Sequence, residues 1–276
     1  MEKENCTIHA AILKIFGRKK KSEIDGFSYI LSSQYDAIEA YIKNEATKQE
    51  FLAIQQNFEG VDHRYLVIKN ENQAILVAYF QLFTLTYKNF NTLKTNAFLK
   101  KIITYFLQFK KVKVLFLGNV LRTNQAAYFY DEKVLEPNEA ISLLSTSVEK
   151  IAKEENISAS ILREIPTNDV DLLTEMGYSS PFKDVMMEME LEPKWQTFAD
   201  YQSDLSRKYA ARSKKIRKSL ENLQKNQLTE QEIKLHSPQI SNLFNQVVEK
   251  QAFVLGKVNA DYFISLKSIY KENFEF

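Results

Sequence analysis

The densest group of side chains that could do chemistry lies between residues 204 and 226, where basic residues far outnumber acidic ones. Apolar residues recur through this stretch at helical spacing and predict one long helix with a narrow apolar stripe. The stripe consists of Leu205, Tyr209, Ile216, Leu220 and Leu223. The basic residues around it are Arg207, Lys208, Arg212, Lys214, Lys215, Arg217, Lys218 and Lys225, and the acidic ones are Asp204 and Glu221.

Like charges gather on one face of this expected helix. Lys208, Arg212 and Lys215 are spaced four and then three residues apart, which costs a few tenths of a kcal/mol per pair in an isolated helix. A bound anion would offset that cost: a phosphate of a nucleotide, of coenzyme A, of tRNA or of a lipid head group. The candidate ligand-binding residues are therefore Arg207, Lys208, Arg212, Lys215 and Lys218. The alternative is a solvated face whose charges pair with acids elsewhere in the fold.

A second candidate site follows a short apolar run at 112–117, which predicts a buried strand. Gly118 and Asn119 come directly after that run, at the kind of strand end where α/β proteins often bind ligands. Arg122 begins a polar loop, so Gly118, Asn119 and Arg122 are a candidate substrate loop. The alternative is a strand-ending glycine followed by a solvated loop.

Residues for nucleophilic or metal chemistry are scarce. The single cysteine, Cys6, cannot form a disulfide within the chain, which fits a reducing compartment. His9, His63 and His236 share no metal-ligand spacing, so no metal is expected. No Ser/His/Asp set or Cys/His pair stands out, and the sequence assigns no catalytic residue.

The composition suits a folded protein with a large core. The chain has 276 residues, of which 45% are hydrophobic, and its net charge is +2. That near-neutral balance does not indicate a DNA-binding protein, and any basic site must be local. The sequence shows no signal peptide and no apolar run long enough for a membrane helix, so we expect a cytoplasmic protein.

The hydrophobic pattern predicts alternating strands and helices, and hence an α/β protein with a mixed sheet and flanking helices. Pro193 and Trp195 mark a change of character, which predicts domains at 1–192 and 193–276. The expected elements are a helix at 35–58, a hairpin of strands at 65–68 and 74–86, a helix at 98–109, a strand at 112–117, a helix at 138–153, a strand at 157–162, a helix at 168–176 and a strand at 187–191.

Several segments carry a family likeness. Residues 195–198 and 205–209 resemble the entry to the second half of a bacterial GNAT-like acyltransferase family, which is related to the Fem-type peptidoglycan aminoacyltransferases. The further matching segments are 64–65, 78–81, 116–119, 240–253, 255–257 and 262–263.

The resemblance implies two GNAT-like halves in tandem and transfer of an acyl group to an amine, such as a small molecule or a cell-wall precursor. It also implies acyl-coenzyme A as a donor, with its pyrophosphate on backbone N–H groups at a helix N-terminus. The family's phosphate loop contains glycines, whereas residues 87–96 contain none. The segment 273–276 has the pattern of a strand start, so we expect an incomplete second half and an unpaired edge open to homodimerisation.

Two functions therefore stay open. The first is a GNAT-like acyltransferase with an unidentified amine acceptor. The second is a catalytically inactive binding or scaffold module that holds an anionic ligand through its basic helix. A third, an RNA-binding helix, is disfavoured by the near-neutral net charge.

Overall fold

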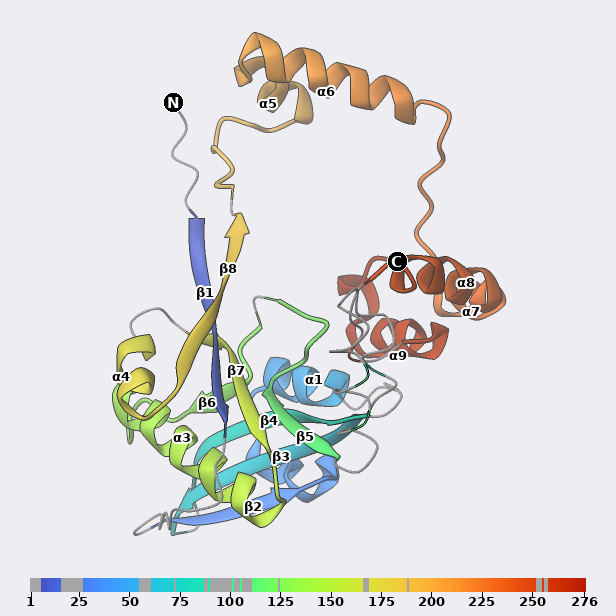
Figure 1. Cartoon of the computed structure of the whole chain (residues 1–276). Coiled ribbons are helices and arrows are strands. Elements are labelled where there is room, and N and C mark those ends of the chain that lie inside the picture. The colour runs from blue at the N-terminus through green and yellow to red at the C-terminus, as the bar shows by residue number, and fades with distance from the viewer. Residues whose placement is uncertain are drawn as a thin grey trace. The chain divides into compact units, whose positions relative to one another are not determined.

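The computed structural model describes most of the chain, and it divides into two compact units (Figure 1). One unit comprises 8–184 and 228–276, and the other comprises 1–7 and 185–227. The expected second domain, 193–276, is therefore divided between the two units. The described residues are 6–15, 27–54, 61–71, 73–86, 89, 101, 105, 111–123, 125–165, 169–187, 189–251, 255 and 258–276.

The strands of the described residues form one mixed sheet, in the order β2-β3-β4-β5-β7-β1-β8, with β6 paired to β4. Strand β7 runs parallel to β5, whereas β2, β3, β4 and β5 pair antiparallel to one another. The strands are β1 (Cys6–Ile15), β2 (Ser28–Ser32), β3 (Val61–Asn70), β4 (Gln73–Leu85), β5 (Val112–Leu117), β6 (Tyr128–Tyr130), β7 (Ala159–Ile165) and β8 (Ser179–Met187).

The helical elements of the described chain are short 3-10 turns and α-helices. They are η1 (Tyr35–Ala37), η2 (Glu39–Tyr41), α1 (Glu45–Ile54), α3 (Pro137–Glu154), α4 (Val170–Glu175), α5 (Phe198–Asp204), α6 (Arg207–Leu220), α7 (Glu230–Leu235), α8 (Ser237–Val248), α9 (Ala260–Tyr270) and η5 (Lys271–Asn273). The expected mixed α/β class is confirmed.

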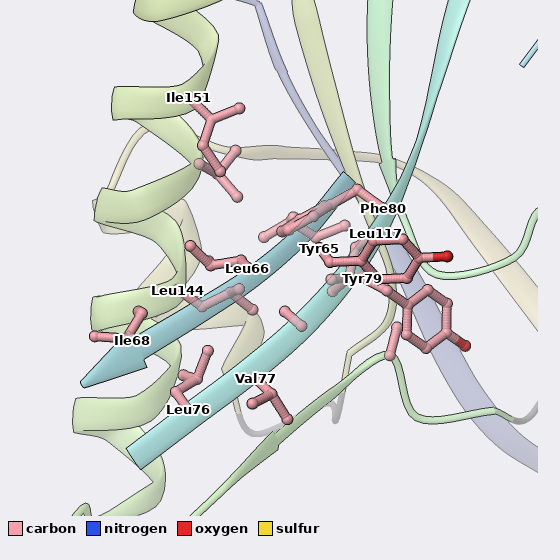
Figure 2. Close-up of a cluster of buried hydrophobic side chains, with 14 of the residues drawn as sticks. Tyr65, Leu66, Ile68, Leu76, Val77, Tyr79, Phe80, Leu117, Leu144 and Ile151 are labelled. Atoms are coloured by element: carbon pink, nitrogen blue, oxygen red, sulfur yellow. The ribbon is translucent and has the colours of Figure 1, made fainter. Parts of the chain in front are cut away.

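Helix α3 covers one face of the central hairpin β3–β4. Figure 2 shows Leu144 and Ile151 of α3 beside Leu66, Ile68 and Leu76 of the two strands, and all five side chains are buried. Because alternate residues of a strand point to opposite faces, the residues in register with them share this face. Burial of these aliphatic side chains fixes α3 on the sheet.

Aromatic side chains fill the opposite face. Tyr65 and Tyr79 lie directly opposite each other on β3 and β4, and both rings contact Phe51 of α1. The Phe51 and Tyr79 rings meet edge to face with centroids 4.8 Å apart, a favourable geometry for aromatic pairs. Helix α1 is therefore held on the face opposite α3.

The segment after residue 228 packs onto the same unit as the sheet. Tyr262 and Leu266 of α9 share a buried cluster with Phe83 of β4 and Phe116 of β5. The chain's last residues pack against α9, because the Phe276 ring lies 4.7 Å from the Phe263 ring of α9 between centroids. The Phe276 carbonyl also accepts from Leu228 N (2.8 Å). Helix α9 thereby extends the helical layer begun by α1.

Several expected elements match the structure. The hairpin, the strand at 112–117 and the helix at 138–153 are confirmed as β3–β4, β5 and α3. The strand at 157–162 is found as β7, shifted by two to three residues. Gly177 has φ +86° just after α4, as expected for a glycine that ends a helix.

The helix expected at 35–58 was wrong over its first part. Residues 35–41 form the turns η1 and η2, and the α-helix begins only at Glu45. Ile38 and Ile42 are nevertheless buried in the core, as their spacing indicated. Burial in short turns produced the same apolar pattern as one long helix.

The strand expected at 187–191 was also wrong, because β8 ends at Met187 and the alternating residues after it lie exposed. Pro181 lies within β8, although proline disfavours the interior of a strand. Since β8 is the last strand in the sheet order, a proline there removes no hydrogen bond from a central ladder.

Two further expectations differ from the structure near the C-terminal half. The long basic helix is interrupted: α5 ends at Asp204, α6 starts at Arg207 and α6 ends at Leu220 rather than near 226. Residues 274–276 form no strand. The helix expected at 98–109 lies outside the described residues except for Lys101 and Tyr105.

The packing of α3 predicts a large effect of truncating its central side chain. Leu144 is fully buried, so Leu144→Ala should lower the free energy of unfolding by about 2–5 kcal/mol. Leu235→Ala makes the same chemical change at a side chain that is 72% exposed and should stay within about 0.5 kcal/mol of the parent. Urea unfolding measures both, and equal effects would contradict the packing.

Candidate functional site

The loop after β5 starts where strand β4 changes its partner. Gly118 N donates to the Tyr79 carbonyl (3.0 Å), and Tyr79 N donates to the Ala127 carbonyl (3.0 Å). Residues 80–85 of β4 pair with β5, whereas residues 76–78, which come before Tyr79, pair with β6. Gly118 has φ +83°, and a Cβ on it would lie 2.9 Å from Ala127 Cβ, so the strand exit requires glycine.

Buried polar groups fasten the start of this loop. The Gln81 side chain, 1% exposed, accepts from Val120 N (2.9 Å) through its Oε1 atom. The Asn119 side chain is also buried, and its Oδ1 atom accepts from Leu121 N (2.9 Å). These bonds satisfy loop N–H groups inside the protein and hold the backbone in one conformation.

A bulge in β7 brings an arginine to the same loop. Between the register pairs Ala10↔Ile165 and Ile12↔Leu162, β7 holds one more residue than β1. Glu164 there has φ +56°, which is uncommon for a residue other than glycine. Arg163 donates to the Asn119 carbonyl (2.9 Å), so the carboxyl ends of the parallel strands β5 and β7 are joined.

Arg122 is the centre of a polar cluster that joins three separate parts of the chain. Its Nη1 atom donates to Glu50 Oε2 of α1 and to Tyr270 Oη of α9, both at 2.6 Å. The guanidinium also lies over the Tyr270 ring, 5.1 Å from its centroid. The Gln125 amide donates to both Glu50 oxygens at 3.0 Å. We call Glu50, Arg122, Gln125 and Tyr270 the Arg122 cluster.

Burial and charge shift the ionisation of this cluster. Burial alone would lower the pKa of Arg122, but the Glu50 charge and Tyr270 raise it overall, so the guanidinium stays charged. Burial raises the pKa of the Tyr270 phenol to about 12, against the opposing charge of Arg122. Burial also raises the pKa of Tyr79, whose phenol interacts electrostatically with Glu50 and Arg122 of this cluster. At neutral pH the cluster thus offers the Arg122 cation and the neutral Tyr270 phenol beside the Glu50 side chain.

The structure places the three residues of the candidate substrate loop together. Gly118, Asn119 and Arg122 lie at the carboxyl end of β5, beside β7 and under α9. Sequence reasoning missed Glu50 and Tyr270, which are 72 and 148 residues from Arg122 along the chain. A Glu and a Tyr on amphipathic helices give no local signal of such a contact.

The basic residues of α6 belong to the other unit and stay exposed. Helix α6 has no buried residue, and Arg207, Lys208, Arg212, Lys215 and Lys218 are all exposed. Within that unit, no described acidic side chain forms an ion pair with any of these five. Pairing with acids of the fold, the alternative left open by the sequence, is not seen there.

The N-terminus of α3, the helix that follows β5 and β6, is closed by acidic side chains. The Glu136 side chain accepts from the N3 backbone, and Glu139 Oε2 accepts from Glu136 N (2.9 Å). A helix N-terminus attracts anions through free N–H groups and its dipole. Two carboxylates already occupy this one, so a phosphate would meet like charge. The glycine-free loop at 87–96 lies outside the described residues except for Asn89.

Comparison with known proteins assigns no family. No protein-family model matches the sequence, and no curated protein matches it either. Across the described residues, no group of three or more His, Cys, Asp or Glu side chains is placed to hold a metal ion. Among those residues, no helix has the length and apolar character needed to cross a bilayer.

The Arg122 cluster predicts energetic coupling between Glu50 and Arg122. Their side chains are 16% and 25% exposed, so Arg122→Gln should cost about 2–3 kcal/mol, less than the loss of a fully buried pair. The double variant with Glu50→Gln should be less destabilised than the sum of the single changes. Additive costs in urea unfolding would show that the pair is not coupled.

A surface pair supplies the matched control for this measurement. Lys194 and Asp204 form an ion pair with side chains 64% and 38% exposed. Lys194→Gln should leave the unfolding midpoint nearly unchanged, because solvent screens such pairs.

Proposed function

We propose that this chain is a GNAT-like acyltransferase that moves an acyl or aminoacyl group from a thioester or similar donor to an amine. The observation that supports this most is the polar loop at the carboxyl ends of the parallel strands β5 and β7, which hydrogen bonds with Gln81 and Arg163 hold in place. Ligands of α/β proteins commonly bind at such strand ends. The mixed sheet with helices on both faces is the architecture that the family resemblance implies.

The Arg122 cluster supplies part of what an amine acceptor would need, namely a group to attract the amine. Amine acylation requires a positioned amine, a base and a donor to the developing oxyanion. In this proposal the Glu50 carboxylate attracts the acceptor as an ammonium, which must lose a proton before its nitrogen attacks the acyl carbon. Arg122 Nη1 lies 2.6 Å from Glu50 Oε2 and orients that carboxylate. The positive φ angle of Gly118 and the hydrogen bond from Leu121 N to Asn119 Oδ1 set the backbone conformation of the adjacent loop. The proposal assigns no catalytic base.

The anionic part of an acyl-coenzyme A donor would bind away from the α3 N-terminus. Glu136 and Glu139 place negative charge where a pyrophosphate would need free N–H groups. The proposed donor is acyl-coenzyme A, and its phosphates must find another cationic or N–H-rich surface.

Donor binding predicts a thermal shift of the full chain. Acetyl-coenzyme A or a longer acyl-coenzyme A at ~100 times its dissociation constant should add about 2.7 kcal/mol of stability. That gain corresponds to a rise of several degrees in the melting temperature. A cooperative melt that no acyl-coenzyme A shifts would contradict a donor site in this chain.

A charge-neutralising variant locates the donor within this experiment. The pair Glu136→Ser and Glu139→Gln keeps a capping box while it removes two negative charges. If the donor binds elsewhere, as proposed, its dissociation constant should stay within about twofold, since the effect of helix-end charges falls off within one turn. Much tighter binding by the variant would place the phosphates at α3 instead.

A second candidate function is a catalytically inactive module that holds an anionic ligand through α6. The observation in its favour is the exposure of Arg207, Lys208, Arg212, Lys215 and Lys218 without an acidic partner among the described residues of their own unit. Under this proposal the sheet unit is a scaffold. Acyl transfer would then be absent while anion binding persists.

Charge reversal on α6 separates the two functions. Arg212→Glu with Lys215→Glu should weaken retention of the chain on a heparin column and flatten its salt dependence, because fewer counterions are released. Turnover with an amine panel should also change if α6 serves the transferase, and no turnover before or after the change favours the module. Unaltered heparin retention would contradict an anion site on α6.

A further inference from the structure

Helix α6 exposes a stripe of large apolar side chains beside its cations. Tyr209, Ile216 and Leu220 are 55%, 52% and 50% exposed. They are spaced seven and four residues apart, so they line one face of the helix. Leu223, just after α6, is 68% exposed and extends the apolar surface. A contiguous exposed apolar surface marks a place where something binds.

Helix α5 leaves this stripe uncovered. The Gln202 amide of α5 donates to Ser213 Oγ (3.0 Å), and the Arg217 guanidinium lies 5.0 Å from the Phe198 ring centroid. Ser213 and Arg217 are four residues apart, so α5 contacts the side of α6 that carries them. The stripe and the basic face remain exposed within this unit.

Three of the cations of α6 lie along one border of the stripe. At about 100° per residue, Lys208, Arg212 and Lys215 centre on a face roughly a quarter-turn from Tyr209, Ile216 and Leu220. Long basic side chains in this position reach toward head groups while their aliphatic stems cover apolar surface. An interfacial helix buries its apolar face at the head-group boundary in this arrangement.

We propose that α6 docks on the surface of an anionic lipid bilayer, with Tyr209, Ile216 and Leu220 in the interface and Lys208, Arg212 and Lys215 on acidic head groups. This inference rests on the anion-binding module above and names its ligand. RNA or a soluble phosphate would pair with the cations but give the apolar stripe nothing to bury against. An anionic bilayer provides a partner for both faces at once.

Vesicle flotation with the full chain tests the proposal. Vesicles of phosphatidylcholine alone are compared with vesicles in which about a third of the lipid is phosphatidylglycerol, a composition that attracts basic segments. The chain should float only with the anionic vesicles at low salt. Its binding should fall as salt rises and screens the head-group charge.

Two variants separate the contributions of charge and apolar surface. Lys208→Glu, Arg212→Glu and Lys215→Glu together should weaken vesicle binding by roughly a hundredfold or more, at about 1 kcal/mol per basic residue. Ile216→Ser with Leu220→Ser keeps every charge and should still weaken binding at least about tenfold, through lost apolar burial. The control is circular dichroism, which should show that both variants keep their helices.

A matched control carries the same change of net charge in the other unit. Lys43, Lys133 and Lys250 are exposed there, and their replacement by Glu should leave vesicle binding within about threefold of the parent, since only charges near the surface contribute. Equal loss in this control would mean that net charge alone drives binding, and would overturn the assignment to α6.

The remaining outcomes also decide the proposal. Equal binding to both vesicle types, or unchanged binding of the Ile216 and Leu220 variant, would overturn it. Binding of a single-stranded RNA oligomer that the serine changes leave intact, without vesicle binding, would make α6 a nucleic-acid site instead. Loss of heparin retention on charge reversal, without vesicle binding, would sink only the lipid proposal and keep the anion-binding module.

Discussion

Strands β3 and β4 are buried on both faces, and the rest of the sheet unit follows from that constraint. Leu66, Ile68 and Leu76 point to α3, and Tyr65 and Tyr79 point to α1. If either apolar face of the hairpin were exposed to water, the fold would lose the stabilisation that burial of that face provides. Helices must therefore cover both sides: α1 directly precedes the hairpin in the sequence, and α3 follows it after β5 and β6.

The length of β4 creates the candidate site. Strand β4 is longer than β5: its residues 80–85 pair with β5, its residues 76–78 pair with β6, and the chain leaves β5 through Gly118. The backbone groups freed at that exit need partners, and Gln81, Asn119 and Arg163 supply them. Arg122 then ties the loop to both helices of the α1 face. The site is thus a consequence of how the sheet ends, with its polar groups held rigidly enough to orient a substrate.

Helix α6 differs from the hairpin, because its side chains are not buried. It has no buried residue, so packing contributes little to it, and its sequence is free to serve a surface role. Arginines and lysines at helical spacing repel one another, and the described residues of their own unit offer their exposed face no acidic partner. An external anionic surface resolves that repulsion, and a bilayer would also cover the stripe of Tyr209, Ile216 and Leu220.

The sequence by itself determined the elements whose pattern is local. The β3–β4 hairpin, β5 and α3 follow from apolar periodicity, and Gly118 and Gly177 mark where chain direction changes. It also placed the basic face of α6, because helical spacing alone sets which cations share a side. It failed at 35–41 and at 189–191, where periodic apolar residues belong to short turns or an exposed segment.

Only the tertiary structure decided the Arg122 cluster and the placement of the last helices. Glu50, Arg122 and Tyr270 meet because α1 and α9 lie on the same face of the sheet, and no spacing along the chain encodes that meeting. Residues 258–276 pack into a core shared with β4 and β5 because Tyr262 and Leu266 complete an apolar surface left by the sheet. Contacts of this kind depend on which surfaces remain to be buried once the sheet has formed, and that is a property of the whole chain.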